Sequence, residues 1–231
     1  RFSPTGKITW SLLLLLLFVS CSRSFIPVQH EYRQYQVHDS LQPDSSYIRY
    51  YQPYKDQLDT AMSDTIGYTD VALTRPYTAP ETLLGNFFAD ALLEAGQRIS
   101  PDADFSFGTK GGLRIALQKG AITVGNIFEL MPFENDLVIL ELTGDSVQQL
   151  AGYIAATGGQ PVAGLQMTIR DSAATSIRIS GAPLDLSRTY RVVTYDYLAN
   201  GGDRVKGLEQ PLSRINTGKK IRALLIDYIR R

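Results

Sequence analysis

Histidine and cysteine are scarce in this sequence of 231 residues, and their scarcity excludes several kinds of catalytic site. The two histidines, His30 and His38, lie in a polar N-terminal stretch, so the sequence offers no imidazole cluster for a two-metal site. The same count excludes Ser-His-Asp and cysteine-based catalysis. The single cysteine, Cys21, has no partner for an internal disulfide.

The sequence also lacks an excess of charge of either sign. Its 23 basic and 23 acidic residues balance, so no global electrostatic attraction draws it toward nucleic acid or an anionic membrane. We therefore expect no nucleic-acid partner, and any phosphate recognition must be local. The length and a hydrophobic content of 44% suit one globular domain with appendages, or at most two small domains.

A long hydrophobic run occurs near the start, in "ITWSLLLLLLFVSCS" after Lys7. A basic residue, a short apolar run and then small residues are typical of a secretory signal, and the run is short for a bilayer span. "FVSC" resembles a bacterial lipobox, with Phe18 where leucine is commoner. We expect residues 1–21 to be a lipoprotein signal peptide, with Cys21 lipidated and the protein anchored in the bacterial envelope, facing the periplasm. The alternative is an ordinary signal peptide with a chance cysteine.

The rest of the chain divides into three predicted segments. Residues 22–46 are polar without a clean period, which indicates an extended tether. Residues 47–70 are expected to be a connector, helical from about 54 to 65 because Pro53 would kink a longer helix. Residues 71–231 are expected to form the folded domain.

Helical and strand patterns alternate irregularly within that domain. Thr78 and Glu81 have capping-box spacing before the apolar face of a helix that continues through "LLGNFFADALLEA". Strands are predicted in "ADFSFGT", "DLVILEL", "GLQMTIR", "SIRIS" and "YRVVTY". Further helices are predicted in "VGNIFELM", after Thr143, and in the closing "TGKKIRALLIDYIRR". This pattern predicts a layered α+β domain with a mixed sheet and packed helices.

Three turn-like segments contain the residues that suit ligand binding: "GTKGGLR" at 108–114, "MPFEN" at 131–135 and "LANGGD" at 198–203. Paired glycines allow backbone N–H groups to approach an anion, and an arginine holds it bidentately. Each segment alone is more often a surface turn, and a lone phenylalanine is more often part of a core. Tyr197 and Asp203, however, put an aromatic ring and a carboxylate on either side of one glycine turn.

The order of these segments resembles the C-terminal domain of the 5′-nucleotidase family. The resemblance runs from about residue 71 to the end, through "ETLLGNFFADALLEA", "GTKGGLR", "ITVGNIFELMPFENDLVILELTGDSV", "YRVVTYDYLANGGD" and "INTGKKIRALLIDYI". It implies the fold of that domain. It also implies that Phe133 and Tyr197 sandwich a nucleobase, that Asn135 bonds a base edge and that Gly164 flanks the base.

The resemblance extends to sugar and phosphate recognition. It implies that Asp203 accepts hydrogen bonds from ribose hydroxyls and that Arg114 grips phosphate. Two positions depart from the family pattern. Thr109 stands where an asparagine is usual, and Arg75 is the nearest residue to the family's further phosphate-binding arginines, without being in register with them.

Members of the family cut phosphate esters with a divalent metal pair in a separate metallophosphoesterase domain, whose histidine motifs this sequence does not contain. We therefore expect no cofactor and no catalytic residue in this chain. The resemblance implies a nucleoside- or nucleotide-binding subunit of a split 5′-nucleotidase, with the metal pair in a partner metallophosphoesterase chain. One alternative is a nucleotide-binding module that does not cut its ligand. The other is a lipoprotein that keeps the fold as an interaction scaffold and has lost the ligand.

Overall fold

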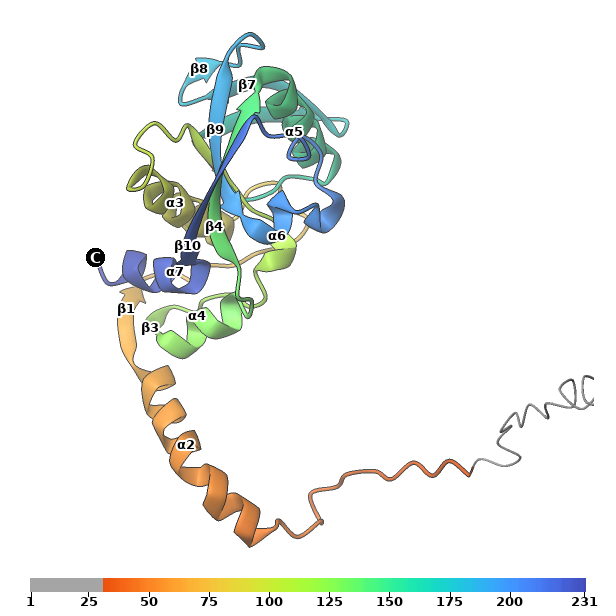
Figure 1. Cartoon of the computed structure of the whole chain (residues 1–231), viewed down its shortest axis with the longest axis vertical. Helices are drawn as coiled ribbons and strands as arrows, with labels where there is room; N and C mark the ends of the chain where they lie inside the picture. Colours follow the sequence, from red (N-terminus) through yellow and green to blue (C-terminus); the bar gives the residue numbers. More distant parts are fainter. Residues whose placement is uncertain (1–30) are drawn as a thin grey trace, which may run out of the picture. The chain divides into compact units, whose positions relative to one another are not determined.

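A computed structural model describes residues 31–231 (Figure 1). The predicted signal peptide, Cys21 and His30 lie outside the described residues. The described residues divide after residue 48 into two units, residues 31–48 and residues 49–231. In the described part of the first unit, His38 is exposed and its carbonyl accepts a hydrogen bond from the Leu41 N–H over 3.0 Å.

The connector begins with a helix that is longer than predicted. Helix α2 spans Ser45–Ser63 and continues through Pro53, so the expected start near residue 54 is wrong. The side chain of Asp44 caps the new start by accepting hydrogen bonds from the N–H groups of Ser46 (2.8 Å) and Tyr47 (3.2 Å). Strand β1 (Thr65–Thr69) follows and pairs antiparallel with β3 (Gly120–Thr123).

A five-stranded mixed sheet forms the centre of the domain, in the order β10-β4-β9-β2-β5. Its strands are β2 (Phe105–Phe107), β4 (Asp136–Thr143), β5 (Val162–Ala163), β9 (Thr189–Tyr195) and β10 (Ser213–Lys220). A second sheet contains β6 (Leu165–Arg170), β7 (Ala173–Ile179) and β8 (Ala182–Pro183). The predicted α+β class with a layered mixed sheet is confirmed.

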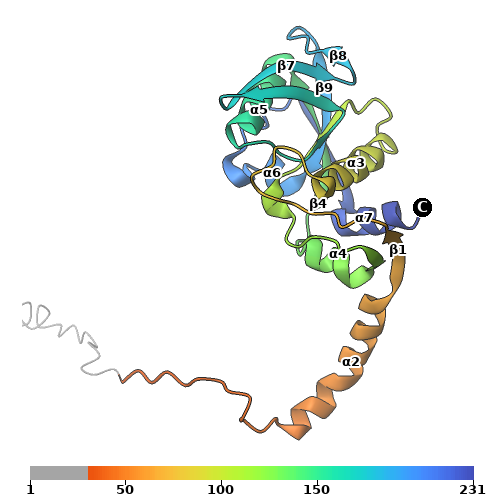
Figure 2. The ribbon, with the colours of Figure 1, turned by 180° about the vertical axis from the view of Figure 1, so that it is seen from behind.

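Helices α3 (Leu83–Gln97) and α5 (Gly144–Ala156) cover opposite faces of the central sheet (Figure 2). Adjacent residues of β2 show this arrangement, because neighbouring side chains of a strand point to opposite faces. The Ser106 hydroxyl donates to the Ala89 carbonyl of α3 over 2.6 Å, whereas Phe107 meets Tyr153 of α5 edge to face. The buried apolar residues of both helices thus form one core with the sheet between them.

Helix α3 begins later than its sequence pattern predicts. Thr82, and not Thr78, is the N-cap, and its hydroxyl oxygen accepts a hydrogen bond from the Gly85 N–H over 3.0 Å. The preceding segment does not join the helix because the carbonyls of Tyr77 and Ala79 accept hydrogen bonds from the buried ammonium of Lys110. A tertiary contact therefore overrides the local capping pattern.

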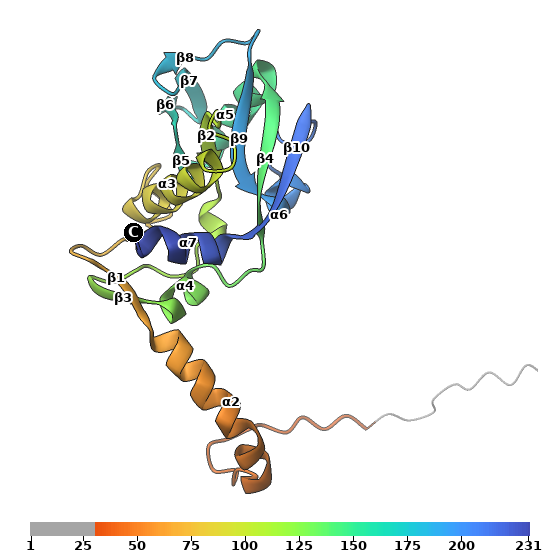
Figure 3. The same ribbon diagram turned by 60° about the vertical axis from the view of Figure 1, so that its left-hand side comes forward.

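The closing helix, α7 (Ile221–Ile229), is also shorter than predicted, because residues 217–220 belong to β10. β10 is an edge strand, which lies outermost beside β4 (Figure 3). Its residues are exposed on both faces, apart from one intermediate position, so no burial imposes an apolar alternation and the pattern did not predict a strand. Two further short helices complete this part of the domain, α4 (Val124–Leu130) and α6 (Asp196–Ala199).

Candidate functional site

The three turn segments meet at one end of the central sheet because of its strand directions. β2 and β9 are parallel, with Phe105 opposite Val192, so their carboxyl ends lie at the same edge. β4 runs antiparallel to β9 and places Leu137 opposite Tyr195, so the start of β4 lies at that edge too. The segments that leave β2, enter β4 and leave β9 therefore converge.

A cavity of about 320 Å³ lies at this convergence. It is lined by Thr109, Gly111, Gly112, Arg114, Phe133, Asn135, Tyr195, Tyr197 and Asp203. Five of the six predicted site residues thus share one cavity, whose size lies at the lower end of the usual range for small-molecule sites.

Gly164, the sixth predicted residue, lines a different cavity of about 490 Å³ beside α3. Its φ is +78°, and a Cβ there would lie 2.5 Å from the Asp104 carbonyl oxygen. A close approach to the backbone that precedes β2 thus accounts for glycine at this position. The structure does not bring Gly164 to the cavity of Phe133 and Tyr197.

Tyr197 lies in the short helix α6, and its ring rests against the glycine turn. A Cβ on Gly202 would come within 2.5–2.6 Å of three Tyr197 ring atoms, so only glycine leaves room for the ring. The Asp196 carboxylate accepts hydrogen bonds from the N–H groups of Tyr197 (2.8 Å) and Asp136 (3.1 Å), which ties α6 to the start of β4. The side chain of Tyr197 is nevertheless 49% exposed, which leaves ring surface for a ligand.

Hydroxyl groups hold both carboxylate oxygens of Asp203. The Tyr197 phenol donates to Oδ1 over 3.0 Å, and the Thr109 hydroxyl donates to Oδ2 over 2.8 Å. Thr109 is itself 3.1 Å from the buried Tyr195 phenol, whose pKa burial raises to about 12. Since a carboxylate offers about four acceptor positions, Asp203 keeps room for the hydroxyls of a ligand.

Arg114 lies over the ring of Phe133, with 5.2 Å between its Cζ and the ring centroid. Arg114 is exposed, and its backbone N–H donates to the Leu130 carbonyl over 2.8 Å. The guanidinium of Arg75 donates to the Arg114 carbonyl over 2.7 Å and stacks over Tyr77. Arg75 therefore supports the backbone of Arg114 and does not itself line the cavity.

Lys110, although it precedes the glycine pair, does not line the cavity. It is 7% exposed, and its ammonium donates to the carbonyls of Tyr77 (3.3 Å), Ala79 (2.7 Å) and Gly158 (3.0 Å). Burial lowers its pKa. Lys110 therefore links the loop of Tyr77 and Ala79 to the loop of Gly158. A lysine beside a glycine pair suits anion binding equally well, so the sequence pattern does not reveal this structural role.

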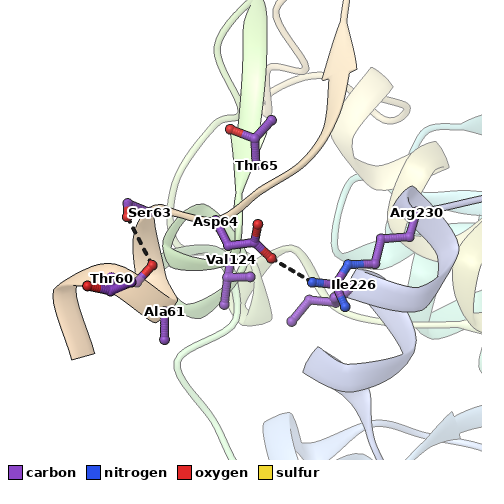
Figure 4. A pocket seen from close by; sticks show the side chains of 8 residues that line it. All are labelled: Thr60, Ala61, Ser63, Asp64, Thr65, Val124, Ile226 and Arg230. Carbon is purple, nitrogen blue, oxygen red and sulfur yellow. Dashed lines mark hydrogen bonds and ion pairs between the residues drawn. The ribbon is translucent and has the colours of Figure 1, made fainter. Parts of the chain in front are cut away.

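A larger, open hollow of about 740 Å³ lies between the end of α2, β1, α4 and α7 (Figure 4). Arg230, the residue directly after α7, pairs there with Asp64 over 2.8 Å. None of the predicted site residues lines this hollow.

The family model of the "5′-nucleotidase, C-terminal domain" matches residues 65–210, which is more than half of the chain. The chain belongs to this family.

Several longer proteins are similar to this family member. A 5′-nucleotidase of Vibrio cholerae is 25% identical over 88% of this chain and 37% of its own length. Protein UshA of Escherichia coli is 30% identical over 61% of this chain and 26% of its own length. The crystal structure of a 5′-nucleotidase precursor from Thermus thermophilus matches 81% of this chain and 41% of its own, at 27% identity and a TM-score of 0.68. The chain therefore spans about a quarter to two fifths of these relatives.

The described part of this family member contains no group of three or more histidine, cysteine, aspartate or glutamate side chains that could hold a metal ion. Across the same residues, no helix is both long and apolar enough to cross a membrane.

Proposed function

We propose that this chain is the nucleoside- or nucleotide-binding subunit of a split 5′-nucleotidase, and that a separate metallophosphoesterase chain carries the hydrolytic centre. The observation that carries the proposal is the shared cavity of Arg114, Phe133, Asn135, Tyr197 and Asp203. Two aromatic rings, an amide, a carboxylate and a guanidinium match the parts of a nucleotide one by one. The names of the similar proteins, 5′-nucleotidases among them, support the same ligand class.

The base is the apolar part of the ligand, and Phe133 and Tyr197 are its proposed partners. Stacking on an aromatic side chain is worth about 1–3 kcal/mol per base and tolerates different bases. Asn135, which lines the same cavity, offers an amide donor and acceptor to one base edge. These contacts favour a nucleoside over a bare sugar phosphate.

The ribose and the phosphate are the polar parts. Asp203 accepts hydrogen bonds from the two ribose hydroxyls, a charge-assisted arrangement that is stronger than a neutral one. Arg114 grips the phosphate, and its backbone carbonyl is held by the guanidinium of Arg75. Because Arg114 lies over Phe133, the phosphate and base positions adjoin, which suits a compact monophosphate.

Hydrolysis is assigned to the partner chain, where the metal pair would activate water and stabilise the phosphoryl group. This chain contributes binding and orientation of the substrate. The proposal also places the chain on the periplasmic face of the bacterial envelope, with a lipid anchor on Cys21.

Calorimetric titration of adenosine, adenosine monophosphate and deoxyadenosine tests the proposal. We expect all three to bind, and we expect Asp203→Ala to weaken the ribonucleoside more than the deoxyribonucleoside, which has one hydroxyl fewer. With Mn²⁺ or Zn²⁺, the chain alone should release no phosphate, and adding a stand-alone metallophosphoesterase from a neighbouring gene should raise the rate or change substrate choice. Absence of binding with that partner present would favour the scaffold alternative, and hydrolysis by the pure chain would contradict the split arrangement.

A further inference from the structure

The loop that carries Phe133 and Asn135 is held by residues at the junction of β10 and α7. Three successive carbonyls of the loop accept hydrogen bonds from three successive residues of that junction. The pairs are Phe133 with Arg222 Nη1 (2.9 Å), Glu134 with Lys220 Nζ (2.9 Å) and Asn135 with the Ile221 N–H (3.0 Å). The loop therefore depends on a segment about 90 residues further along the chain.

Arg222 makes the most extensive of these contacts. Its side chain is only 14% exposed, and its Cζ lies over the Phe128 ring, 4.3 Å from the centroid. Its guanidinium also forms an ion pair with Glu134 and reaches the Met131 carbonyl at 3.5 Å. A planar, forked cation can stack on a ring and bond a carbonyl at once, which the flexible ammonium of lysine does less well.

We infer that Arg222 is a positioning residue for the Phe133 half of the site. Helix α7 contacts both α3 and α4 (Figure 3), so Arg222 extends from an element anchored in the core toward a loop at the rim. It also lies outside residues 65–210, which the family model matches. The expected effect on ligand affinity rests on the proposed function. The claim that Arg222 holds the loop of Phe133 does not depend on that function.

The Tyr197 half of the site has a separate support. Tyr197 rests against the glycine turn and bonds Asp203, and Asp203 is bonded in turn by Thr109, so this support comes from elements other than α7. Arg114 touches the Phe133 ring but keeps its own backbone hydrogen bond to Leu130 of α4, so loss of Arg222 should weaken recognition of the base far more than recognition of the sugar and phosphate. A general loss of stability would weaken both.

The test is Arg222→Met in the full chain, titrated with adenosine monophosphate and with ribose 5-phosphate, which lacks the base. We expect affinity for the monophosphate to fall about tenfold and affinity for ribose 5-phosphate to stay within twofold. Arg222→Lys should lie between Arg222→Met and the wild type. Arg230→Met is the matched control, because it removes an arginine at the other end of α7, its C-cap, which pairs with Asp64 away from the loop.

Amide hydrogen exchange of residues 131–136 gives a readout that needs no ligand. We expect exchange in this segment to rise about tenfold in Arg222→Met, with α5 unchanged. Unchanged exchange, equal losses for the two ligands, or faster exchange with full affinity would each overturn the inference. If the wild-type chain binds neither ligand, the proposed function fails, and the exchange measurement still decides whether Arg222 holds the loop.

Discussion

The phenol of Tyr197 donates a hydrogen bond to the Oδ1 atom of Asp203 over 3.0 Å. The aromatic ring and the carboxylate that flank the glycine turn are therefore one hydrogen-bonded unit, and not two independent contacts. The Thr109 hydroxyl completes the unit by donating to the other carboxylate oxygen. Thr109, which stands where the family usually has an asparagine, thus orients Asp203, the acid that is proposed to bind ribose.

This hydrogen bond predicts a loss of affinity in Tyr197→Phe. A ring that only stacks would tolerate the loss of its hydroxyl, but here the loss frees one oxygen of Asp203. We expect adenosine affinity to fall by about two- to tenfold, the usual range for one hydrogen bond, and to fall further in Tyr197→Ala, which also loses stacking. Calorimetry on both variants measures this, with Tyr68→Phe on the exposed strand β1 as the control. Wild-type affinity in Tyr197→Phe would show that the phenol does not orient the acid.

Gly202 should be intolerant of even one added methyl group. The Cβ of Gly202→Ala would overlap the ring of Tyr197, so the ring must leave its place and ligand affinity should fall at least fivefold. Gly152→Ala in helix α5 is the control, because its Cβ meets nothing within 4 Å and alanine is the better helix former by about 1 kcal/mol. Full affinity in Gly202→Ala would mean that the Tyr197 ring need not lie on this turn.

Arg114 and Lys110 lie four residues apart and should behave differently. Arg114→Met should abolish any preference for adenosine monophosphate over adenosine, with little loss of stability. Lys110→Met should keep that preference but lower the free energy of unfolding by about 2–3 kcal/mol, because it leaves buried carbonyls without a donor. Urea denaturation and calorimetry separate the two effects, and Lys119→Met, at an exposed site, is the control. Loss of the preference for the monophosphate in Lys110→Met would show that Lys110 takes part in phosphate binding.

The buried phenol of Tyr195 should make the fold sensitive to alkali. Its pKa is raised to about 12, so between about pH 10 and 12 the folded state keeps a proton that the unfolded state releases. The free energy of unfolding should therefore fall as pH rises, by up to about 1.4 kcal/mol per pH unit.

The Tyr195 contribution is measured as a difference between two proteins. Urea unfolding at pH 9.5 and 11.5 should show a smaller loss in Tyr195→Phe than in the wild type. The comparison is needed because burial lowers the pKa of Lys110, an effect of opposite sign that both proteins share. Equal losses in the two proteins would contradict the raised pKa.

The anchor prediction concerns Cys21, which lies outside the described residues. Cys21→Ser should abolish labelling by a fatty acid and release the protein from the membrane fraction. Metabolic labelling of the wild type and the variant measures this. Equal label on both would leave an ordinary signal peptide as the explanation.

Strong local patterns made much of the fold predictable. The apolar run of β4 and the periodic faces of α3 and α5 were identified because burial imposes those periods on the sequence. Elements whose stability comes from elsewhere were missed or misplaced. β10 is a polar edge strand. α3 begins later than predicted, because the buried ammonium of Lys110 donates to the Ala79 carbonyl just before it.

By itself, the sequence determined the α+β class through its periodicity, and the order of its short motifs determined the family through resemblance, together with the residues that line the cavity. Only the tertiary structure decided which partners those residues have. Thr109 meets Asp203 across 94 residues and Arg222 meets Phe133 across 89, distances along the chain that no local pattern encodes. Such contacts follow from strand direction and helix packing, which bring the carboxyl ends of β2 and β9, the start of β4 and the first turn of α7 together.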